Sequence, residues 1–170
     1  MTDTTITYGI YDSPVGRLTI NGNSDVVQGI TFSQGSRACF PQSNWRRDDA
    51  HYKMAISQLK AYFAGDLKTF EFAFDLAGTS FQNSVWKTLL NIPYGETNTY
   101  SQIAALIGKP KAVRAVGAAN GANPLPIIVP CHRVIGRSGS LTGFGGGLPA
   151  KLFLLELEAA NSEGQCSHRI

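Results

Sequence analysis

Residues 99–121, TYSQIAALIGKPKAVRAVGAANG, predict two short helices joined by a tight turn. Thr99 and Gln102 form a T-x-x-Q capping box, in which hydroxyl and amide side chains satisfy free amides of the first helical turn. Gly108 ends this helix, and Pro110 is expected to start a second helix that runs to the end of the quoted stretch. Two short helices with a glycine-containing turn are typical of a helix-turn-helix.

The second of these helices has small side chains on nearly every side, with Arg114 as the only long side chain near its middle. Small residues let a helix backbone approach another surface closely. That surface is either the protein core or the groove of a nucleic acid, with Arg114 projecting into it. The composition of the helix by itself favours packing against the core.

The chain before this pair predicts a small sheet and two further helices. Alternating apolar and polar residues predict antiparallel strands near residues 6–11, 17–21 and 27–32. Asp48 or Asp49 is expected to cap a helix that runs to Ala64, before Gly65.

Another helix is expected to begin at Thr79 or Ser80 and to stop at Ile92-Pro93. We therefore predict an α+β protein with two domains. Residues 1–78 form a small antiparallel sheet with a helix, and residues 79–170 are mainly helical, with a frayed tail from about residue 160.

Length and composition exclude several classes of protein. The chain has 170 residues, of which 43% are hydrophobic and 16% charged, which argues against disorder. No apolar run approaches the roughly 18 residues of a membrane span, and residues 1–5 do not resemble a secretory signal, so a cytoplasmic location is expected. Cys39, Cys131 and Cys166 are far apart and odd in number, so we predict no disulfide framework, no metal and no cofactor.

Positive charge is concentrated in the second half of the chain. Residues 87–151 hold seven Lys or Arg and one acidic residue, a net charge of +6. Such a segment indicates either a surface that faces a polyanion or simply a basic solvated face, and charge alone does not separate the two. If the polyanion is DNA, seven basic residues predict binding that weakens strongly with salt.

Residues 127–136, IIVPCHRVIG, contain the candidate nucleophile. An apolar run, either a buried strand or an extended core segment, leads directly into Cys131, which His132 and Arg133 follow. Positive neighbours favour the thiolate, which is the nucleophilic form of cysteine. A cysteine beside a histidine is nevertheless more often inert, so the pair alone decides little.

The wider pattern resembles the O6-alkylguanine-DNA alkyltransferase family. Besides the PCHR motif, five blocks fall in the family's order and spacing: Tyr100–Ala104, Arg114–Asn120, Asn123-Pro124, Thr142–Gly147 and Lys151–Glu158. The resemblance is strong over residues 79–158 and only general over residues 1–78. It implies a ribonuclease-H-like N-terminal domain and a winged-helix-like C-terminal domain.

The resemblance implies a single-use repair reaction on O6-alkylguanine, and also on O4-alkylthymine. Cys131 would accept the alkyl group as an irreversible thioether. His132 would take the thiol proton through a bound water, with Glu158 polarising His132, as in a catalytic triad. Asn123 would tie the turn around the active site to the helix-turn-helix.

The resemblance also implies how DNA is held. The second helix would lie in the minor groove of double-stranded DNA, Tyr100 would rotate the damaged nucleotide outward, and Arg114 would fill the gap in the stack. The candidate DNA contacts are Arg114, Tyr100, Ser101, Gln82, Lys109 and Arg137. The candidate walls of the base pocket are Pro126, Val134, Phe144 and Gly145. Many relatives have Tyr where this chain has Phe144, so one hydroxyl donor to the flipped guanine is missing here.

Three other functions compete with this interpretation. Alkyltransferase-like proteins bind damaged DNA without chemistry, but they replace the cysteine, typically with tryptophan. A helix-turn-helix regulator would need several base-reading side chains, whereas the second helix offers mainly Arg114. A cysteine hydrolase would turn over esters or peptides without DNA. A monomer is expected in solution, and cooperative assembly on DNA is left open.

Overall fold

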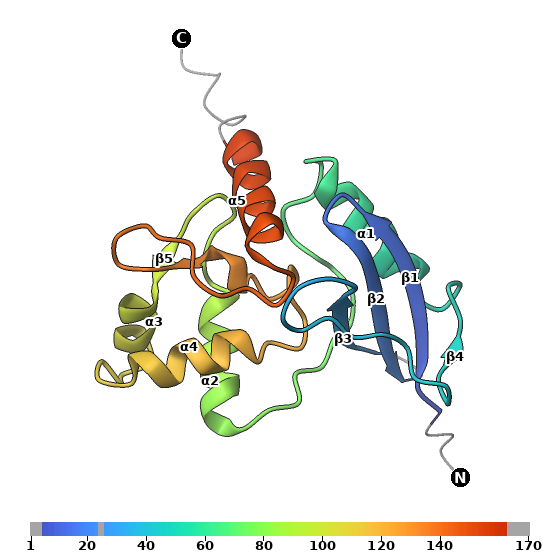
Figure 1. Ribbon diagram of the computed structural model, residues 1–170, viewed down its shortest axis with the longest axis horizontal. Helices are drawn as coiled ribbons and strands as arrows, with labels where there is room; N and C mark the ends of the chain where they lie inside the picture. The colour runs from blue at the N-terminus through green and yellow to red at the C-terminus, as the bar shows by residue number, and fades with distance from the viewer. Residues whose placement is uncertain (1–4, 24–25, 163–170) are drawn as a thin grey trace.

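A four-stranded sheet and one helix form the N-terminal part of the protein in a computed structural model, which describes residues 5–23 and 26–162 (Figure 1). The elements are β1 (Thr7–Ser13), β2 (Gly16–Asn23), β3 (Val26–Phe32), β4 (Arg46–Arg47) and α1 (Lys53–Phe63). The sheet order is β3-β2-β1-β4, and β1, β2 and β3 pair antiparallel as predicted. The sequence did not predict β4, a strand of two residues that pairs parallel to β1.

The start of α1 differs from the prediction. The helix begins at Lys53, and its N-cap residue makes no side-chain capping bond. Asp48 and Asp49 were expected to cap it, but their carboxylates accept bonds from backbone amides of a preceding turn and of β1. Both acceptors are therefore used before the helix starts. The predicted end is confirmed, because Gly65 follows the helix with a positive φ of 81°.

Helices dominate the second part of the chain. The elements are α2 (Ser80–Leu89), β5 (Asn98–Thr99), α3 (Tyr100–Leu106), α4 (Val113–Gly121), the 3-10 helix η1 (Cys131–Arg133), β6 (Val134–Ile135) and α5 (Leu148–Ser162). Complete capping boxes start α2 and α3, at Thr79 with Gln82 and at Thr99 with Gln102. The predicted helix-turn-helix is formed by α3 and α4. However, α4 begins at Val113 and not at Pro110, because the turn after α3 continues that far.

The apolar run before the nucleophile is a buried, non-strand segment. Ile127 adopts a positive φ of 76°, which is uncommon for a β-branched residue, and only an isolated bridge links Pro126 with Val129. Ile127, Ile128 and Val129 are all buried. The segment therefore anchors η1 in the core without joining a sheet.

The final helix joins the two parts of the molecule. In Figure 1, α5 stands between the sheet with α1 on one side and α2, α3 and α4 on the other. It continues to Ser162, past residue 160 where we expected fraying, and Cys166 lies outside the described residues. A single buried cluster includes side chains from both parts. The predicted α+β fold is confirmed, and within the described ranges no helix is long and apolar enough to cross a membrane.

Candidate active site and DNA-binding surface

Cys131 opens onto a cavity of about 200 Å³ at the meeting point of the two parts. Three of the predicted wall residues, Pro126, Phe144 and Gly145, line this cavity. Val134, the fourth, is fully buried and is not among the residues that line it. The sheet contributes the opposite wall through the end of β3 and the loop that follows it, which carry Phe32, Arg37 and Cys39. Phe32 contacts Phe144 edge-to-face, with ring centroids 5.4 Å apart.

The thiol of Cys131 is not shifted toward the thiolate, although its positive neighbours in sequence suggested this shift. Burial raises the pKa of Cys131, and the hydrogen bond of Asn123 and the charges of Lys151 and Arg37 offset that rise only in part. Arg133 does not contribute, because its guanidinium is paired with Glu158. The thiol is therefore protonated at rest, and a nearby base must remove its proton before attack.

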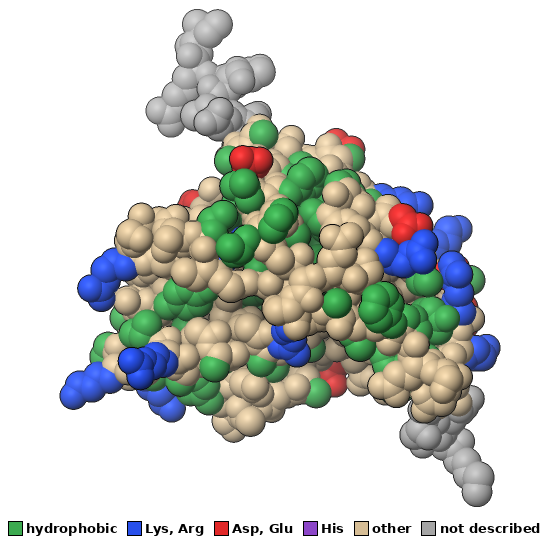
Figure 2. All heavy atoms as spheres, viewed as in Figure 1, with side chains coloured by type: hydrophobic (Ala, Val, Ile, Leu, Met, Phe, Trp, Pro, Cys, Tyr) green, Lys and Arg blue, Asp and Glu red, His purple; other side chains and the backbone are tan. Residues whose placement is uncertain are grey.

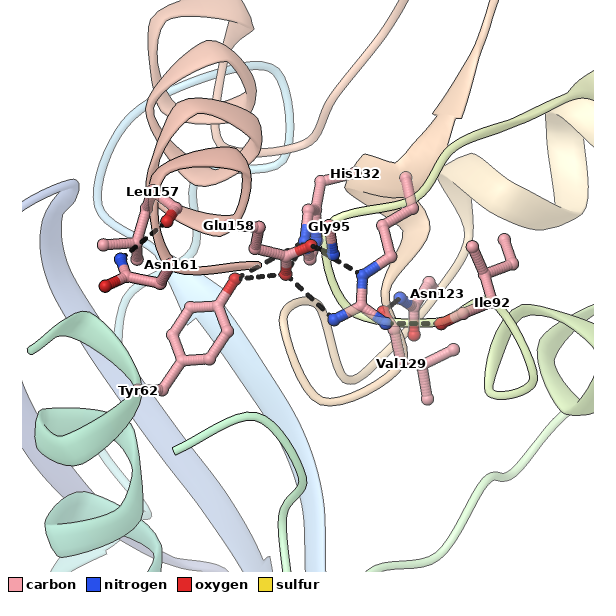
Figure 3. Close-up of polar contacts among 10 residues, drawn as sticks. Tyr62, Ile92, Gly95, Asn123, Val129, His132, Leu157, Glu158 and Asn161 are labelled. Atoms are coloured by element: carbon pink, nitrogen blue, oxygen red, sulfur yellow. Dashed lines mark hydrogen bonds and ion pairs between the residues drawn. The ribbon is translucent and has the colours of Figure 1, made fainter. Parts of the chain in front are cut away.

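His132, the next residue along the chain, is the candidate for that base, and Glu158 fixes the orientation of its ring. His132 Nε2 lies 2.7 Å from Glu158 Oε1, and both residues are essentially fully buried (Figure 3). Because a carboxylate can only accept, Nε2 carries the proton and donates it to Glu158. The other ring nitrogen, Nδ1, is buried and has no hydrogen-bond partner among the described residues. Burial lowers the pKa of His132, against the opposing effect of Glu158, so the ring is neutral and Nδ1 can accept a proton.

The Glu158 carboxylate is held by more groups than the sequence suggested. Arg133 donates to both of its oxygens, at 2.8 Å from Nε and 2.9 Å from Nη2, and the Gly95 amide donates at 3.1 Å. Tyr62 on α1 donates its hydroxyl to Oε1 at 2.7 Å, as Figure 3 shows. Burial alone would raise the pKa of Glu158, but the hydrogen bonds of His132 and Arg133 outweigh it and hold the pKa well below its usual range. Glu158 is therefore a buried carboxylate that stays ionised.

Asn123 and Lys151 shape the loops around the nucleophile. Asn123 donates to the Val129 carbonyl at 2.8 Å, and its own oxygen accepts from the Leu125 amide. Lys151 on α5 is completely buried and donates to the carbonyls of Val134 at 2.6 Å and Thr142 at 2.8 Å. Lys151 thus joins the strand after η1 to the loop that carries Phe144.

The predicted DNA contacts lie on a different surface from this buried network. Arg114, Lys109 and Arg137 are exposed, and Ser101 is half-buried at the start of α3. Tyr100 is half-buried and accepts a hydrogen bond from Thr142 at 3.1 Å. The side chain of Gln82 is occupied in the capping box of α2.

Figure 2 shows Lys and Arg side chains along the edge of the molecule where Figure 1 places the connection between α3 and α4. Only five of the seven basic residues in 87–151 are available there or nearby, because Arg133 and Lys151 are buried. The positive charge that residues 87–151 expose is therefore lower by two than their sequence alone suggests. Groups of three or more His, Cys, Asp or Glu side chains that could hold a metal ion do not occur in residues 5–23 or 26–162.

A helix-turn-helix with exposed cations, together with a buried cysteine that precedes a histidine–glutamate pair, is the arrangement expected of a DNA-binding protein with a cysteine site. Comparison with known families agrees with this class. The model of the 6-O-methylguanine DNA methyltransferase DNA binding domain matches residues 80–160, and that of the ribonuclease-like domain of the same enzymes matches residues 6–76.

Relatives and solved structures extend the match over most of the chain. The methylated-DNA–protein-cysteine methyltransferase of Mycobacterium tuberculosis (strain H37Rv) is 50% identical over 157 residues, which are 92% of this chain and 94% of that protein. The one from Methanosarcina acetivorans is 48% identical over 90% of this chain and 98% of its own length. The crystal structure of M. tuberculosis OGT in complex with DNA has a TM-score of 0.85 at 50% identity, covering 91% of this chain and 94% of that one.

The chain belongs to the methylated-DNA–protein-cysteine methyltransferase family. It is a DNA-binding methyltransferase of DNA repair. The family resemblance inferred from the PCHR motif and its flanking blocks is thereby confirmed.

Proposed function

We propose that the protein repairs double-stranded DNA by transferring the alkyl group from O6 of guanine to Cys131, once per molecule. The observation that carries this proposal is the cavity of about 200 Å³ on which Cys131 lies. Its walls include the apolar rings of Pro126 and Phe144, which suit a flat base and a small alkyl group. His132 follows Cys131 in the chain and bonds Glu158 at 2.7 Å, which suits the order nucleophile, base and orienting carboxylate.

The chemistry balances without a cofactor. The thiol proton of Cys131 passes through a water to His132 Nδ1, and Glu158 stabilises the imidazolium that forms. The thiolate attacks the alkyl carbon, so that a carbon–sulfur bond forms as the carbon–O6 bond breaks. The guanine leaves with the electron pair and takes one proton back, which restores neutral His132. Because a thioether has no easily displaced group, Cys131 is not regenerated.

DNA must present the base outside the duplex, because the buried thiol of Cys131 cannot reach the alkyl group of a base that stays stacked. We propose that α4 approaches the minor groove and that Arg114 occupies the space left by the flipped nucleotide. Arg114 is exposed, and the rest of α4 is mostly Ala, Val and Gly, which allows close approach. Tyr100 lies at the start of α3 beside this surface and would crowd the phosphate next to the lesion.

Arg37 is the only charged residue among the described residues that line the cavity, so the walls have no other charged group that could distinguish a purine from a pyrimidine. We therefore include O4-alkylthymine as a second substrate and expect it to react more slowly. The protein acts as a monomer in this scheme, since the nucleophile, the base and the DNA-binding helices all come from one chain.

Mass spectrometry tests the proposal directly. The protein is incubated with a duplex that contains one O6-methylguanine, and its intact mass and peptides are measured. We expect one methyl group per molecule, confined to the peptide with Cys131, and none with the Cys131→Ser variant or an unmodified duplex. Tight binding without a change in mass would contradict the proposal and favour a damage-binding protein. Removal of several methyl groups from DNA by each protein molecule would contradict single use.

A further inference from the structure

Tyr62 brings the N-terminal part of the protein into the proton-transfer network. It lies near the end of α1 and is completely buried. Its hydroxyl lies 2.7 Å from Glu158 Oε1 and 3.5 Å from His132 Nε2. The other groups that bond Glu158, which are His132, Arg133 and the Gly95 amide, belong to the second part of the chain. Tyr62 belongs to α1, in the N-terminal part.

We propose that Tyr62 is a positioning residue for alkyl transfer, which moderates the basicity of His132 by donating to the same Glu158 oxygen that His132 uses. This inference rests on the proposed function of His132 as the base for Cys131. It assigns a role in the chemistry to the N-terminal part beyond forming a wall of the cavity.

The argument begins with the crowding of donors on one oxygen. Glu158 Oε1 accepts from Tyr62, from His132 Nε2 at 2.7 Å and from Arg133 Nη2 at 2.9 Å. Each donor withdraws negative charge from that oxygen, so each weakens what remains for the others. Removal of the Tyr62 hydroxyl leaves more negative charge on Glu158 Oε1, and this charge stabilises the imidazolium form of His132. The orientation of the carboxylate is kept, because Arg133 still donates to both oxygens.

The direction of the effect follows from the groups that surround the ring. His132 is faced by the carboxylate of Glu158, which favours its charged form, and by the cations Arg133 and Lys151 and its own burial, which disfavour it. Cys131 precedes it, and Tyr94 contacts Tyr62 with ring centroids 6.1 Å apart. Among the described donors to Glu158 Oε1, which are Tyr62, His132 and Arg133, only the Tyr62 hydroxyl can be removed without removing a cation or the histidine itself.

The ring of Tyr62 has a packing role that can be kept separate from its hydroxyl. It makes edge-to-face contacts with Phe63 and Tyr94 and a tilted contact with Phe70. Tyr62→Phe keeps these ring contacts and removes only the hydroxyl, which bonds Glu158 at 2.7 Å and lies 3.5 Å from His132 Nε2. Tyr52→Phe is the matched control, because Tyr52 is also buried beside α1 but bonds Thr7, far from the site.

The test is the titration of His132 in the free protein, followed by NMR of ¹⁵N-labelled histidine and assigned with a His132→Asn variant. We expect Tyr62→Phe to raise the pKa of His132 by about half a unit to one unit and Tyr52→Phe to leave it unchanged. The acid limb of the single-turnover methyl transfer rate should move to higher pH by the same amount. A purely structural role of Tyr62 would move neither quantity.

A pKa of His132 that is the same in Tyr62→Phe and the wild type would overturn the inference, as would an equal shift in Tyr52→Phe. If Tyr62→Phe does not fold, replacement of all tyrosines by 3-fluorotyrosine makes Tyr62 a stronger donor and must lower the pKa of His132. A rise or no change there also refutes the inference. Because the titration needs no DNA, its outcome is independent of whether the wild type accepts a methyl group.

Discussion

Glu158→Gln is the substitution that most directly tests how the site is held. The side chain keeps its shape and one carbonyl oxygen, but an amide group replaces the oxygen that accepts from Arg133 Nε at 2.8 Å and from the Gly95 amide at 3.1 Å. Arg133 Nε and the Gly95 amide, which are both donors, then face the amide group of the glutamine, which is also a donor. Arg133, only 7% exposed, loses the charge that compensates it.

The expected loss of stability is large. Removal of one partner from a buried ion pair costs about 3–5 kcal/mol, because the remaining charge is left uncompensated. With a urea m-value of about 2 kcal/mol/M, this lowers the unfolding midpoint by roughly 2 M. Since domains are stable by only about 5–15 kcal/mol, the variant should fold but with a much reduced margin.

Equilibrium urea unfolding at pH 7.5, followed by tryptophan fluorescence, measures this loss. Glu156→Gln is the control, because Glu156 is exposed on the same helix and should change the stability by no more than about 0.5 kcal/mol. The single-turnover rate of Glu158→Gln should also fall by about 100-fold or more, since the amide cannot stabilise an imidazolium. If Glu158→Gln lost less than about 1 kcal/mol with an unchanged m-value, the carboxylate could not be the group that holds Arg133.

Three further predictions address DNA binding, the leaving group and the thiol. Arg114→Ala should weaken binding to duplex DNA in fluorescence anisotropy while leaving the unfolding midpoint unchanged, and Lys53→Ala, an exposed change on α1, should alter neither. Phe144→Tyr should raise the single-turnover rate, by an amount equivalent to at most about 3 kcal/mol, and no gain would mean that the leaving-group donor is supplied elsewhere. Iodoacetamide should modify exposed Cys39 before buried Cys131. The rate of modification at Cys131 should still be rising above pH 9, because burial raises the pKa of its thiol. Equal modification rates for the two peptides in mass spectrometry would contradict the buried, protonated thiol.

Local signals in the sequence were enough to place the main elements. The predicted capping box of Thr99 and Gln102 depends on residues three positions apart, and it is present in the structure. The predicted helix start at Thr79 or Ser80 is confirmed as well. The short parallel strand β4 could not be predicted in the same way, because its two arginines become a strand only by pairing with β1. Asp48 and Asp49 look like helix caps, but a turn and a strand edge use their carboxylates first.

The site shows the same division between local and tertiary information. The neighbours of Cys131 in sequence suggested a thiolate, yet Arg133 points to Glu158 and the thiol is buried. Tyr62 was not predicted as part of the site, because nothing near it in sequence points to Glu158, 96 residues away. Lys151 left a readable signal: it is seven residues from Glu158, with Leu154 between them, so all three share the buried face of α5.

A protonated, buried thiol would be an advantage for the single-use reaction proposed above. A thiolate exposed at rest would react with any electrophile in solution, and each such event would consume a molecule. Burial of Cys131 in a cavity of about 200 Å³ makes the thiolate unfavourable until a proton acceptor is used. In the proposed reaction His132 is that acceptor and Glu158 stabilises its charged form. Arg133 and Tyr62 are two of the groups that bond Glu158. The proposed reactivity of Cys131 therefore depends on a carboxylate that both parts of the molecule hold. Glu158→Gln should lower both stability and rate, whereas Tyr62→Phe should change the proton affinity of His132.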